Sequence, residues 1–307
     1  MSATITSGTG YRGRFAPSPT GPLHFGSLVS ALGSYMLARQ QHGEWFVRID
    51  DLDTPRIVEH ADSEILHCLE TCGLYWDGPV EYQSQRLQRY DQVLQQLIQE
   101  NQVFFCHCSR QEIAAIAHTG IEGLVYPGTC RNNTTPAESA AIRIKSQATE
   151  ICFDDLFQDR ICQELEQDVG DFIIKRADGL FAYQLAIVID DEDQQISEII
   201  RGADLINSTP RQIFLQRILG FRTPVYGHLP VIVNQDGQKL SKQSYARPVI
   251  LKQAGHALAN AFIVLGQNMP DELLRADTVD IWQWADECWD STLIPRNREI
   301  LAPLDMH

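Results

Sequence analysis

The sequence predicts an α/β protein built on a parallel sheet, and three observations support this fold class. Strand-like and helix-like segments alternate through the first half of the chain, a pattern typical of a parallel sheet covered by helices on both faces. The chain has 307 residues, enough for one large domain or two moderate ones. Apolar residues make up 44% of it and charged residues 21%, which excludes a disordered, collagen-like or coiled-coil protein.

The alternating elements of the first half can be placed in order. A strand at 11–15 leads to a helix that opens near Gly26. A second strand at 44–50 leads to a helix at about 55–72, and a further helix is expected at about 84–100.

The second half begins with a strand at 103–106, which runs into a cysteine-bearing loop rich in Gly, Pro, Asn and Thr. Beyond this loop we expect strands at 141–146, 171–176, 181–190 and 197–202, a helix from about Thr209, a hairpin at 230–239 turning on Asp236-Gly237, and helices thereafter. The resulting division is a flexible tail at 1–10, a main domain at 11–243 with an insertion at about 102–175, and a helical region at 244–307.

Charge, cysteine content and the N-terminal residues narrow the class of protein. The net charge of −15 counts against a protein that coats nucleic acid indiscriminately, so an RNA partner would have to bind at a restricted patch. The chain has no apolar stretch long enough for a membrane span, and its first ten residues do not resemble a signal peptide, so we expect a cytoplasmic protein. Eight cysteines in such a chain favour free thiols or a metal site over a disulfide framework.

A candidate phosphate-binding segment follows the first strand and reads APSPTGPLHFGS, residues 16–27. Its prolines restrict the loop, Gly26 permits close approach of a ligand to the backbone, and the following helix start offers N–H groups to an anion. His24 stands next to this pocket and can donate a hydrogen bond to a phosphate oxygen. A proline-rich connection capped by Ser27 would show the same local pattern.

A second candidate segment reads KLSKQ, residues 239–243. It places two ammonium groups, those of Lys239 and Lys242, three residues apart just after the expected hairpin. A positioned lysine stabilises charge that develops on a leaving phosphate group. An exposed basic turn would look the same, so neither segment decides the function alone.

Together the two segments resemble the HIGH and KMSKS signatures of class I aminoacyl-tRNA synthetases, in the version of the glutamyl- and glutaminyl-type enzymes. The FAPSPTGxLHxG opening of these enzymes is matched from Phe15 through Gly26. The resemblance implies a Rossmann-like catalytic domain that binds ATP. Mg²⁺ is expected with the nucleotide, because ATP chemistry usually needs it. The residues it assigns to ATP are His24, Gly26, Ser27, Lys239 and Lys242, of which His24 and Lys242 would act on the phosphates during catalysis.

The same resemblance implies that the amino acid is L-glutamate. A substrate with two carboxylates needs cationic partners, and the planar fork of arginine suits a carboxylate best. The residues that match the amino-acid pocket of the family are Arg14, Phe15, Ala16, Pro17, Ser18, Asp50, Tyr183 and Arg201. Asp50 is a departure, because the family usually carries Glu there, one methylene longer. Its neighbours Asp51 and Asp53 are expected to hold the loop and its Arg56.

Three cysteines, Cys106, Cys108 and Cys130, fall within one polar loop and can meet at a tetrahedral structural zinc. Chemistry alone favours a histidine as the fourth ligand, either His107 or His118. The resemblance to short paralogues of glutamyl-tRNA synthetases, which bind zinc through a CxC…YxxxC pattern, implies Tyr126 instead. The remaining cysteines are expected to be core or helix-face residues: Cys68, Cys72, Cys152, Cys162 and Cys288.

Only sixty-four residues follow Gln243, too few for the anticodon-binding domains of full glutamyl-tRNA synthetases. The chain therefore resembles the short paralogues in this respect too. That resemblance implies tRNA-independent activation of glutamate and its transfer to the queuosine base in the anticodon of tRNA(Asp). We expect the protein to be a monomer. A conventional glutamyl-tRNA synthetase catalytic core and a non-catalytic, nucleotide-binding regulatory paralogue are the alternatives.

Overall fold

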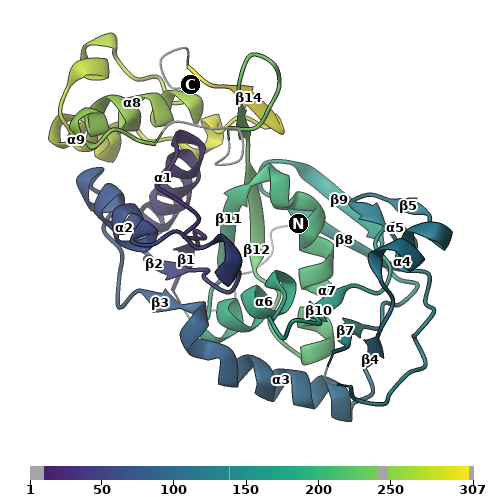
Figure 1. The fold of residues 1–307 in the computed structure, drawn as a ribbon. Coiled ribbons are helices and arrows are strands. Elements are labelled where there is room, and N and C mark those ends of the chain that lie inside the picture. The colour runs from purple at the N-terminus through teal and green to yellow at the C-terminus, as the bar shows by residue number, and fades with distance from the viewer. Residues whose placement is uncertain (1–9, 138, 241–247, 304–307) are drawn as a thin grey trace.

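The computed structural model describes residues 10–137, 139–240 and 248–303 (Figure 1). The tail expected at 1–10 therefore lies almost wholly outside the described residues. Within the described ranges no helix is both long and apolar enough to cross a membrane. The elements of the first hundred residues are β1 (Arg12–Phe15), α1 (Phe25–Gln40), β2 (Glu44–Ile49), η1 (Thr54–Arg56), α2 (Ala61–Thr71), β3 (Glu81–Tyr82), η2 (Gln83–Arg86) and α3 (Leu87–Gln99).

A parallel sheet forms the centre of the molecule. β1 pairs in parallel with β2, and β2 with β3. On its other side β1 is bonded to the segment that enters β11, because the backbone N–H of Ser197 donates to the carbonyl of Arg12 at 2.9 Å. β11 in turn pairs in parallel with β12. The parallel sheet predicted from the βα alternation is thus confirmed, and β1 lies between β2 and β11.

An insertion of small antiparallel sheets separates α3 from the second half of the central sheet. Its elements are β4 (Val103–Cys106), α4 (Arg110–Ile116), β5 (Thr119–Gly120), β6 (Gly123–Leu124), β7 (Ala141–Ile144), β8 (Glu150–Asp155), β9 (Asp159–Glu164), α5 (Leu165–Asp168) and β10 (Ile173–Lys175). β7 is the middle strand of an antiparallel sheet with β4 and β10. Figure 1 shows these strands gathered on the side of the molecule away from α1 and α2.

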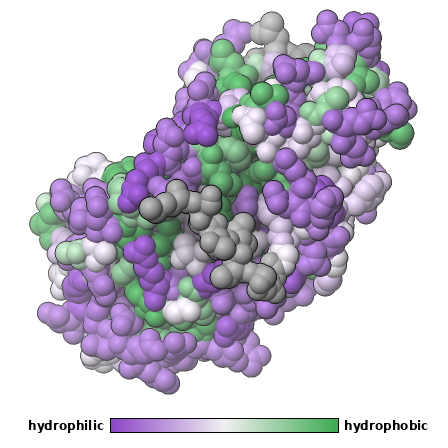
Figure 2. All heavy atoms as spheres, turned by 180° about the vertical axis from the view of Figure 1, so that it is seen from behind, coloured by the Kyte–Doolittle hydropathy of each residue, from purple (hydrophilic) through white to green (hydrophobic). Residues whose placement is uncertain are grey.

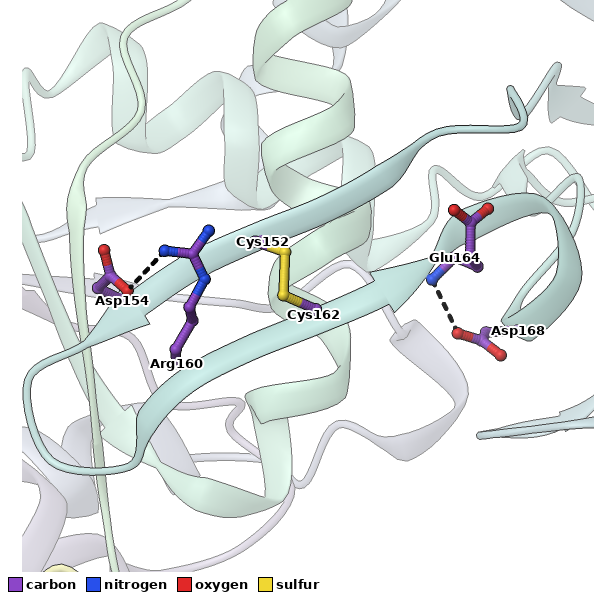
Figure 3. Close-up of a disulfide and its surroundings, with 6 residues drawn as sticks. All are labelled: Cys152, Asp154, Arg160, Cys162, Glu164 and Asp168. Atoms are coloured by element: carbon purple, nitrogen blue, oxygen red, sulfur yellow. Dashed lines mark hydrogen bonds and ion pairs between the residues drawn. A yellow bond between two sulfur atoms is a disulfide. The ribbon is translucent and has the colours of Figure 1, made fainter.

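The hairpin of β8 and β9 is absent from the elements expected from the sequence, and it corrects the assignment of two cysteines (Figure 3). The expectation that Cys152 and Cys162 are core or helix-face thiols is wrong, because the structure joins them in a disulfide. The antiparallel register sets these two residues directly opposite each other, so both side chains project from the same face of the hairpin. Cys68 and Cys72 are buried as expected, whereas Cys288 is exposed on its helix.

The second half of the chain returns to the central sheet. Its elements are α6 (Tyr183–Asp193), β11 (Glu198–Gly202), η3 (Ala203–Ser208), α7 (Thr209–Leu219), β12 (Val225–Leu229), β13 (Val231–Val233), η5 (Leu251–Gln253), α8 (Ala254–Val264), η6 (Asp271–Arg275), α9 (Thr278–Cys288), η7 (Ser291–Leu293) and β14 (Glu299–Leu301). The turn expected at Asp236-Gly237 is present, with Gly237 at a φ of 74° and Val233 bridged to Lys239. The C-terminal helices pack on α1, as Figure 1 shows.

Two expected elements differ from the structure. The apolar segment 181–190 is predicted as a strand but forms the helix α6. It is buried almost all round, and a short apolar run lacks the polar spacing that separates a helix from a strand. The helix predicted at 55–72 begins only at Ala61, because His60 adopts the left-handed region with a φ of 64° and breaks the path from η1.

Two buried apolar clusters stabilise the fold. One joins α1, α2 and β2 to α8, and the other joins α3, α6 and α7 to the sheet of β4, β7 and β10. Figure 2 shows that hydrophilic side chains cover most of one face of the molecule, while hydrophobic residues appear mainly near its middle. The burial of apolar surface in each cluster is the main favourable contribution to folding.

Candidate active site

A cavity of about 490 Å³ lies at the carboxyl ends of β1 and β11. Ligands of open α/β sheets bind where the strand order reverses, and β1 is such a point because β2 and β11 lie on its two sides. The volume is in the range of small-molecule sites. Eleven of the site residues predicted from the sequence line this cavity: Arg14, Phe15, Ala16, Pro17, Ser18, His24, Gly26, Ser27, Tyr183, Arg201 and Lys239.

The start of α1 forms one wall of the cavity, and His24 caps it. The backbone N–H of Ser27 donates to His24 Nδ1 at 3.2 Å. With Nδ1 accepting, the proton lies on Nε2, which is 3.0 Å from the hydroxyl oxygen of Ser27. A Cβ added at Gly26 would lie 3.3 Å from His24 Nδ1, so glycine leaves the imidazole room beside the helix start. The arrangement presents an N–H group and the positive end of a helix dipole to an anion.

The KLSKQ segment is only partly described. Lys239 lines the cavity, where its ammonium group forms an ion pair with Asp204 at 2.6 Å. Lys242 lies outside the described residues. The chain leaves the cavity wall at Leu240 and returns beside His24, where the backbone N–H of Val249 donates to the carbonyl of Leu23 at 2.9 Å.

Arg201 forms the cationic wall of the cavity at the end of β11. Its side chain is buried, and its fork is bonded on two sides: Nε donates to His228 at 3.1 Å, and Nη2 donates to Thr209 at 2.9 Å and Gln212 at 2.8 Å. Nη1 is buried and has no hydrogen-bond partner among the described residues. A buried donor without a partner is costly, so this nitrogen is suited to an acceptor brought by a ligand.

Arg14 and Tyr183 stand on neighbouring parts of the wall. Arg14 donates through Nε and Nη2 to the carboxylate of Asp191, at 3.1 and 3.2 Å, so only part of its fork remains for a ligand. Burial disfavours a charged Asp191, but Arg14 and Arg48 outweigh it and hold the pKa of this carboxyl below its usual value. Burial raises the pKa of Tyr183, so its phenol stays protonated and able to donate.

Asp50 lies next to the cavity but is not part of its lining. Its backbone N–H donates to the carbonyl of Pro17 at 3.0 Å, while its carboxylate accepts from Arg48 Nε at 2.9 Å. Burial raises the pKa of Asp50 to about 6 despite the charge of Arg48. The structure thus ties Asp50 to Arg48, and its contact with a substrate ammonium group stays a prediction. The expected pairing of Asp53 with Arg56 is confirmed at 2.6 Å.

The cysteine loop brings its three thiols together. The sulfur atoms of Cys106, Cys108 and Cys130 all lie within 4.8 Å of one another, close to the spacing of about 3.8 Å at a tetrahedral zinc. Cys106 ends β4, and a capping box between Ser109 and Glu112 starts α4 directly after Cys108. The donor set and its spacing are consistent with a metal site.

Tyr126 places a hydroxyl oxygen within reach of these thiols. Its hydroxyl oxygen lies 3.4 Å from Cys108 Sγ and accepts the backbone N–H of Cys130 at 2.8 Å. Of the competing histidines, His107 is exposed and His118 contacts the carbonyl of Gln167 at 2.9 Å. The geometry therefore favours Tyr126 over either histidine.

Comparison with known proteins agrees with this geometry. Residues 11–261 match the family model of the catalytic domain of class I tRNA synthetases (E and Q). A glutamyl-Q tRNA(Asp) synthetase of Dechloromonas aromatica is 52% identical over 95% of this chain and 98% of its own length. The chain belongs to the glutamyl-Q tRNA(Asp) synthetase family. Another member of this family, from Pseudomonas aeruginosa, is 46% identical over 93% of this chain and 96% of its own length.

Solved structures of larger class I enzymes share the fold of this family member. A glutamate tRNA ligase of Elizabethkingia meningosepticum superimposes with a TM-score of 0.76 at 24% identity, covering 96% of this chain and 68% of that one. A glutamate-tRNA synthetase of Elizabethkingia anophelis gives the same TM-score at 23% identity, covering 97% and 69%. At this identity the likeness shows the fold alone.

Sequence reasoning missed four polar residues at the site of this glutamyl-Q tRNA(Asp) synthetase family member. Asp191 binds Arg14, Asp204 binds Lys239, and His228 with Asp155 lies behind Arg201. The acidic run DEDQ at the end of α6 is a weak signal for Asp191, because charged residues at a helix end are usually solvated. The other three have no local signal, since their partners are distant in the sequence.

Proposed function

We propose that the chain activates L-glutamate with MgATP in the absence of tRNA and transfers it to the queuosine base in the anticodon of tRNA(Asp). The observation that carries the proposal is one cavity lined by both the His24 helix start and the open donor of Arg201. The same cavity then offers an anion site and a carboxylate site to the two substrates. Two relatives that the chain covers almost completely are glutamyl-Q tRNA(Asp) synthetases, which supports the same acceptor.

The first step needs no covalent nucleophile from the protein. A carboxylate oxygen of glutamate attacks the α-phosphorus of ATP, the bond to the β-phosphate oxygen breaks, and glutamyl adenylate and pyrophosphate form. His24 would donate from Nε2 to a phosphate oxygen, and Lys242 would stabilise the charge on the departing pyrophosphate. Holding two reactants in line contributes on the order of 7–11 kcal/mol, so positioning and electrostatics are sufficient.

Recognition of glutamate would rest on Arg201 and Tyr183. Arg201 Nη1 is the buried donor left open, and the protonated phenol of Tyr183 lines the same cavity. A charge-assisted hydrogen bond from arginine to a carboxylate is about twice as strong as a neutral one. An uncharged side chain on the substrate would leave this donor poorly paired, which favours glutamate over neutral analogues.

In the second step a hydroxyl oxygen of the queuosine ring attacks the carbonyl carbon of the adenylate. An ester forms, the bond to AMP breaks, and the hydroxyl proton leaves with the AMP phosphate or solvent. The net charge of −15 means that the tRNA must be held at a restricted surface.

Pyrophosphate exchange tests the activation step. We expect exchange of labelled pyrophosphate into ATP that depends on glutamate and proceeds without tRNA. Charging of tRNA(Asp) with queuosine is then compared with charging of tRNA(Asp) lacking it and of tRNA(Glu). Charging of tRNA(Glu) alone would favour a conventional glutamyl-tRNA synthetase core, and the absence of exchange under all conditions would favour a non-catalytic paralogue.

A second proposal concerns the metal. Cys106, Cys108, Cys130 and Tyr126 would hold one Zn²⁺, whose chemistry here is structural because the four ligands close the coordination sphere. The loop between β4 and β7 is polar, and its own apolar cluster is small. Metal ligation would therefore supply much of the free energy that orders it.

Replacing Cys130 by serine is expected to reduce bound zinc from about one ion per chain to near zero and to open the loop to proteolysis, because a ligand is lost. The measurement is metal content by atomic emission, with limited proteolysis. Cys288→Ser is the matched control, since this cysteine is exposed and lies outside the cluster. Full zinc content in Cys130→Ser would contradict the ligand set. Loss of zinc in His118→Ala but not in Tyr126→Phe would move the fourth ligand to histidine.

A further inference from the structure

Arg201 and His228 face each other across two parallel strands. The register of β11 with β12 makes them direct neighbours, and Arg201 Nε donates to His228 Nε2 at 3.1 Å. His228 is fully buried and does not line the cavity. Among the described residues, Arg201 is the cavity-lining side chain to which His228 is hydrogen-bonded, so His228 would affect a ligand through Arg201.

His228 can accept from Arg201 only as the neutral tautomer with its proton on Nδ1. Asp155 enforces that tautomer, because its Oδ2 lies 2.6 Å from His228 Nδ1. The other oxygen, Oδ1, accepts the backbone N–H groups of His228, Phe157 and Gln158, each at 3.0 Å. These bonds fix the carboxylate in place, so the proton on Nδ1 and the bare Nε2 follow from the geometry.

The charges around the imidazole also keep it neutral. Burial and the nearby Arg201 cation lower the pKa of His228 to about 4, although Asp155 and the more distant Asp204 favour the charged form. Asp155 stays ionised: burial opposes its charge, but the bonds from His228 and the backbone hold its pKa below its usual value. Tyr226, whose ring lies parallel to the imidazole with centroids 6.3 Å apart, is kept protonated by burial, which raises its pKa to about 12.

We infer that Asp155 and His228 form a positioning pair that holds the fork of Arg201 so that Nη1 is the nitrogen presented to a carboxylate of the substrate. This inference rests on the proposed function, because it assumes that Arg201 binds glutamate. His228 accepts from Nε, and Thr209 and Gln212 accept from Nη2. Two of the three guanidinium nitrogens are therefore already bonded to residues of β12 and α7. A planar fork held at two nitrogens has its third direction determined.

The assignment gives the β8–β9 hairpin a role at the site. Asp155 is the last residue of β8, three residues beyond the disulfide-bonded Cys152, and β8 packs beside β12. Figure 3 shows the disulfide that joins the two strands of this hairpin. The hairpin thus places the carboxylate of Asp155 beside His228, which in turn accepts a hydrogen bond from Arg201 in the central sheet. The alternative is that His228 has a structural role only, in which case replacing it would not specifically change the KM for glutamate.

Two variants of His228 distinguish a positioning role from a structural role. His228→Leu removes the acceptor, whereas the Oε1 of His228→Gln can take the place of Nε2. We expect His228→Leu to raise the KM for glutamate in pyrophosphate exchange by about 10- to 100-fold, the effect of a lost bond to a charged group. The KM for ATP should stay within about twofold, and His228→Gln should bring the KM for glutamate most of the way back to the wild-type value. Asp155→Asn should raise the glutamate KM in the same direction.

The tautomer itself gives a readout that does not depend on activity. Nitrogen NMR of the imidazole should show His228 with a proton on Nδ1 and none on Nε2 throughout pH 5.5 to 8. A proton on Nε2 would overturn the inference, as would an unchanged glutamate KM in both His228→Leu and Asp155→Asn. Equal rises in the KM for ATP and for glutamate in His228→Leu, with a lowered melting temperature and no recovery in His228→Gln, would show a structural role only. Wild-type protein without glutamate-dependent exchange would refute the proposed function and the inference resting on it, whereas normal exchange with unaffected variants would refute the positioning pair alone.

Discussion

Replacing Lys242 by alanine is expected to slow glutamate-dependent pyrophosphate exchange by about 10²- to 10³-fold while changing glutamate binding little. A donor aimed at charge that develops only in the transition state has effects of this size when it is removed. The pyrophosphate leaving group gains charge as its bond to the α-phosphorus breaks, whereas bound glutamate does not. The measurement compares kcat for exchange with the dissociation constant of glutamate, determined by calorimetry.

Lys239→Ala is the matched control in the same segment. Its ammonium group already pairs with Asp204 at 2.6 Å, and nearly half of its side chain is exposed, so we expect a smaller loss in exchange. Equal losses of glutamate affinity and of kcat in Lys242→Ala would contradict a role confined to the transition state. A larger effect at Lys239 would exchange the roles of the two lysines.

Replacing Arg201 by glutamine is expected to lower kcat/KM for glutamate by about 10²- to 10³-fold, mainly through KM. Truncating one partner of a buried, charge-assisted pair costs about 2–5 kcal/mol, since the carboxylate is left without its counter-charge. The same substitution leaves His228 without the guanidinium that donates to it. The measurement is pyrophosphate exchange at varied glutamate, with circular dichroism to verify the fold.

Two further variants bracket this result. Arg201→Lys keeps the charge but loses the planar fork, so its activity should fall between that of the wild type and that of the glutamine variant. Arg56→Gln is the surface control, because this exposed arginine pairs with Asp53 and does not line the cavity. Unchanged kcat/KM in Arg201→Gln, with the fold intact, would exclude Arg201 from glutamate recognition.

The segments that could be predicted are those that a pattern among neighbouring residues is sufficient to identify. The loop from Ala16 to Ser27 combines prolines, a glycine and a helix start, and the structure places it on the cavity wall as expected. The spacing of Cys106, Cys108 and Cys130 likewise predicts a cluster that the structure contains. Each of these patterns restricts local backbone geometry or supplies one class of ligand, so neighbouring residues suffice to reveal it.

Segments governed by distant contacts could not be predicted in this way. The apolar run at 181–190 forms α6 because it is buried on nearly all sides, so its sequence lacks the polar stripe that marks a surface helix. The disulfide depends on the register of β8 with β9, which neither cysteine reveals by itself. The ion pair between Arg14 and Asp191 joins residues 177 positions apart.

Local sequence patterns are sufficient to predict the α/β class, the phosphate-binding loop, the three clustered thiols and the arginines suited to a carboxylate. How those arginines are used follows from contacts between segments that lie far apart in the chain. Arg201 and His228 are 27 residues apart, and His228 and Asp155 are 73 apart, so only the pairing of β11 with β12 and the packing of β8 unite them. Hydrogen bonds act over about 3 Å, and the distances that matter to them are set by strand register and packing, which spacing along the chain does not encode.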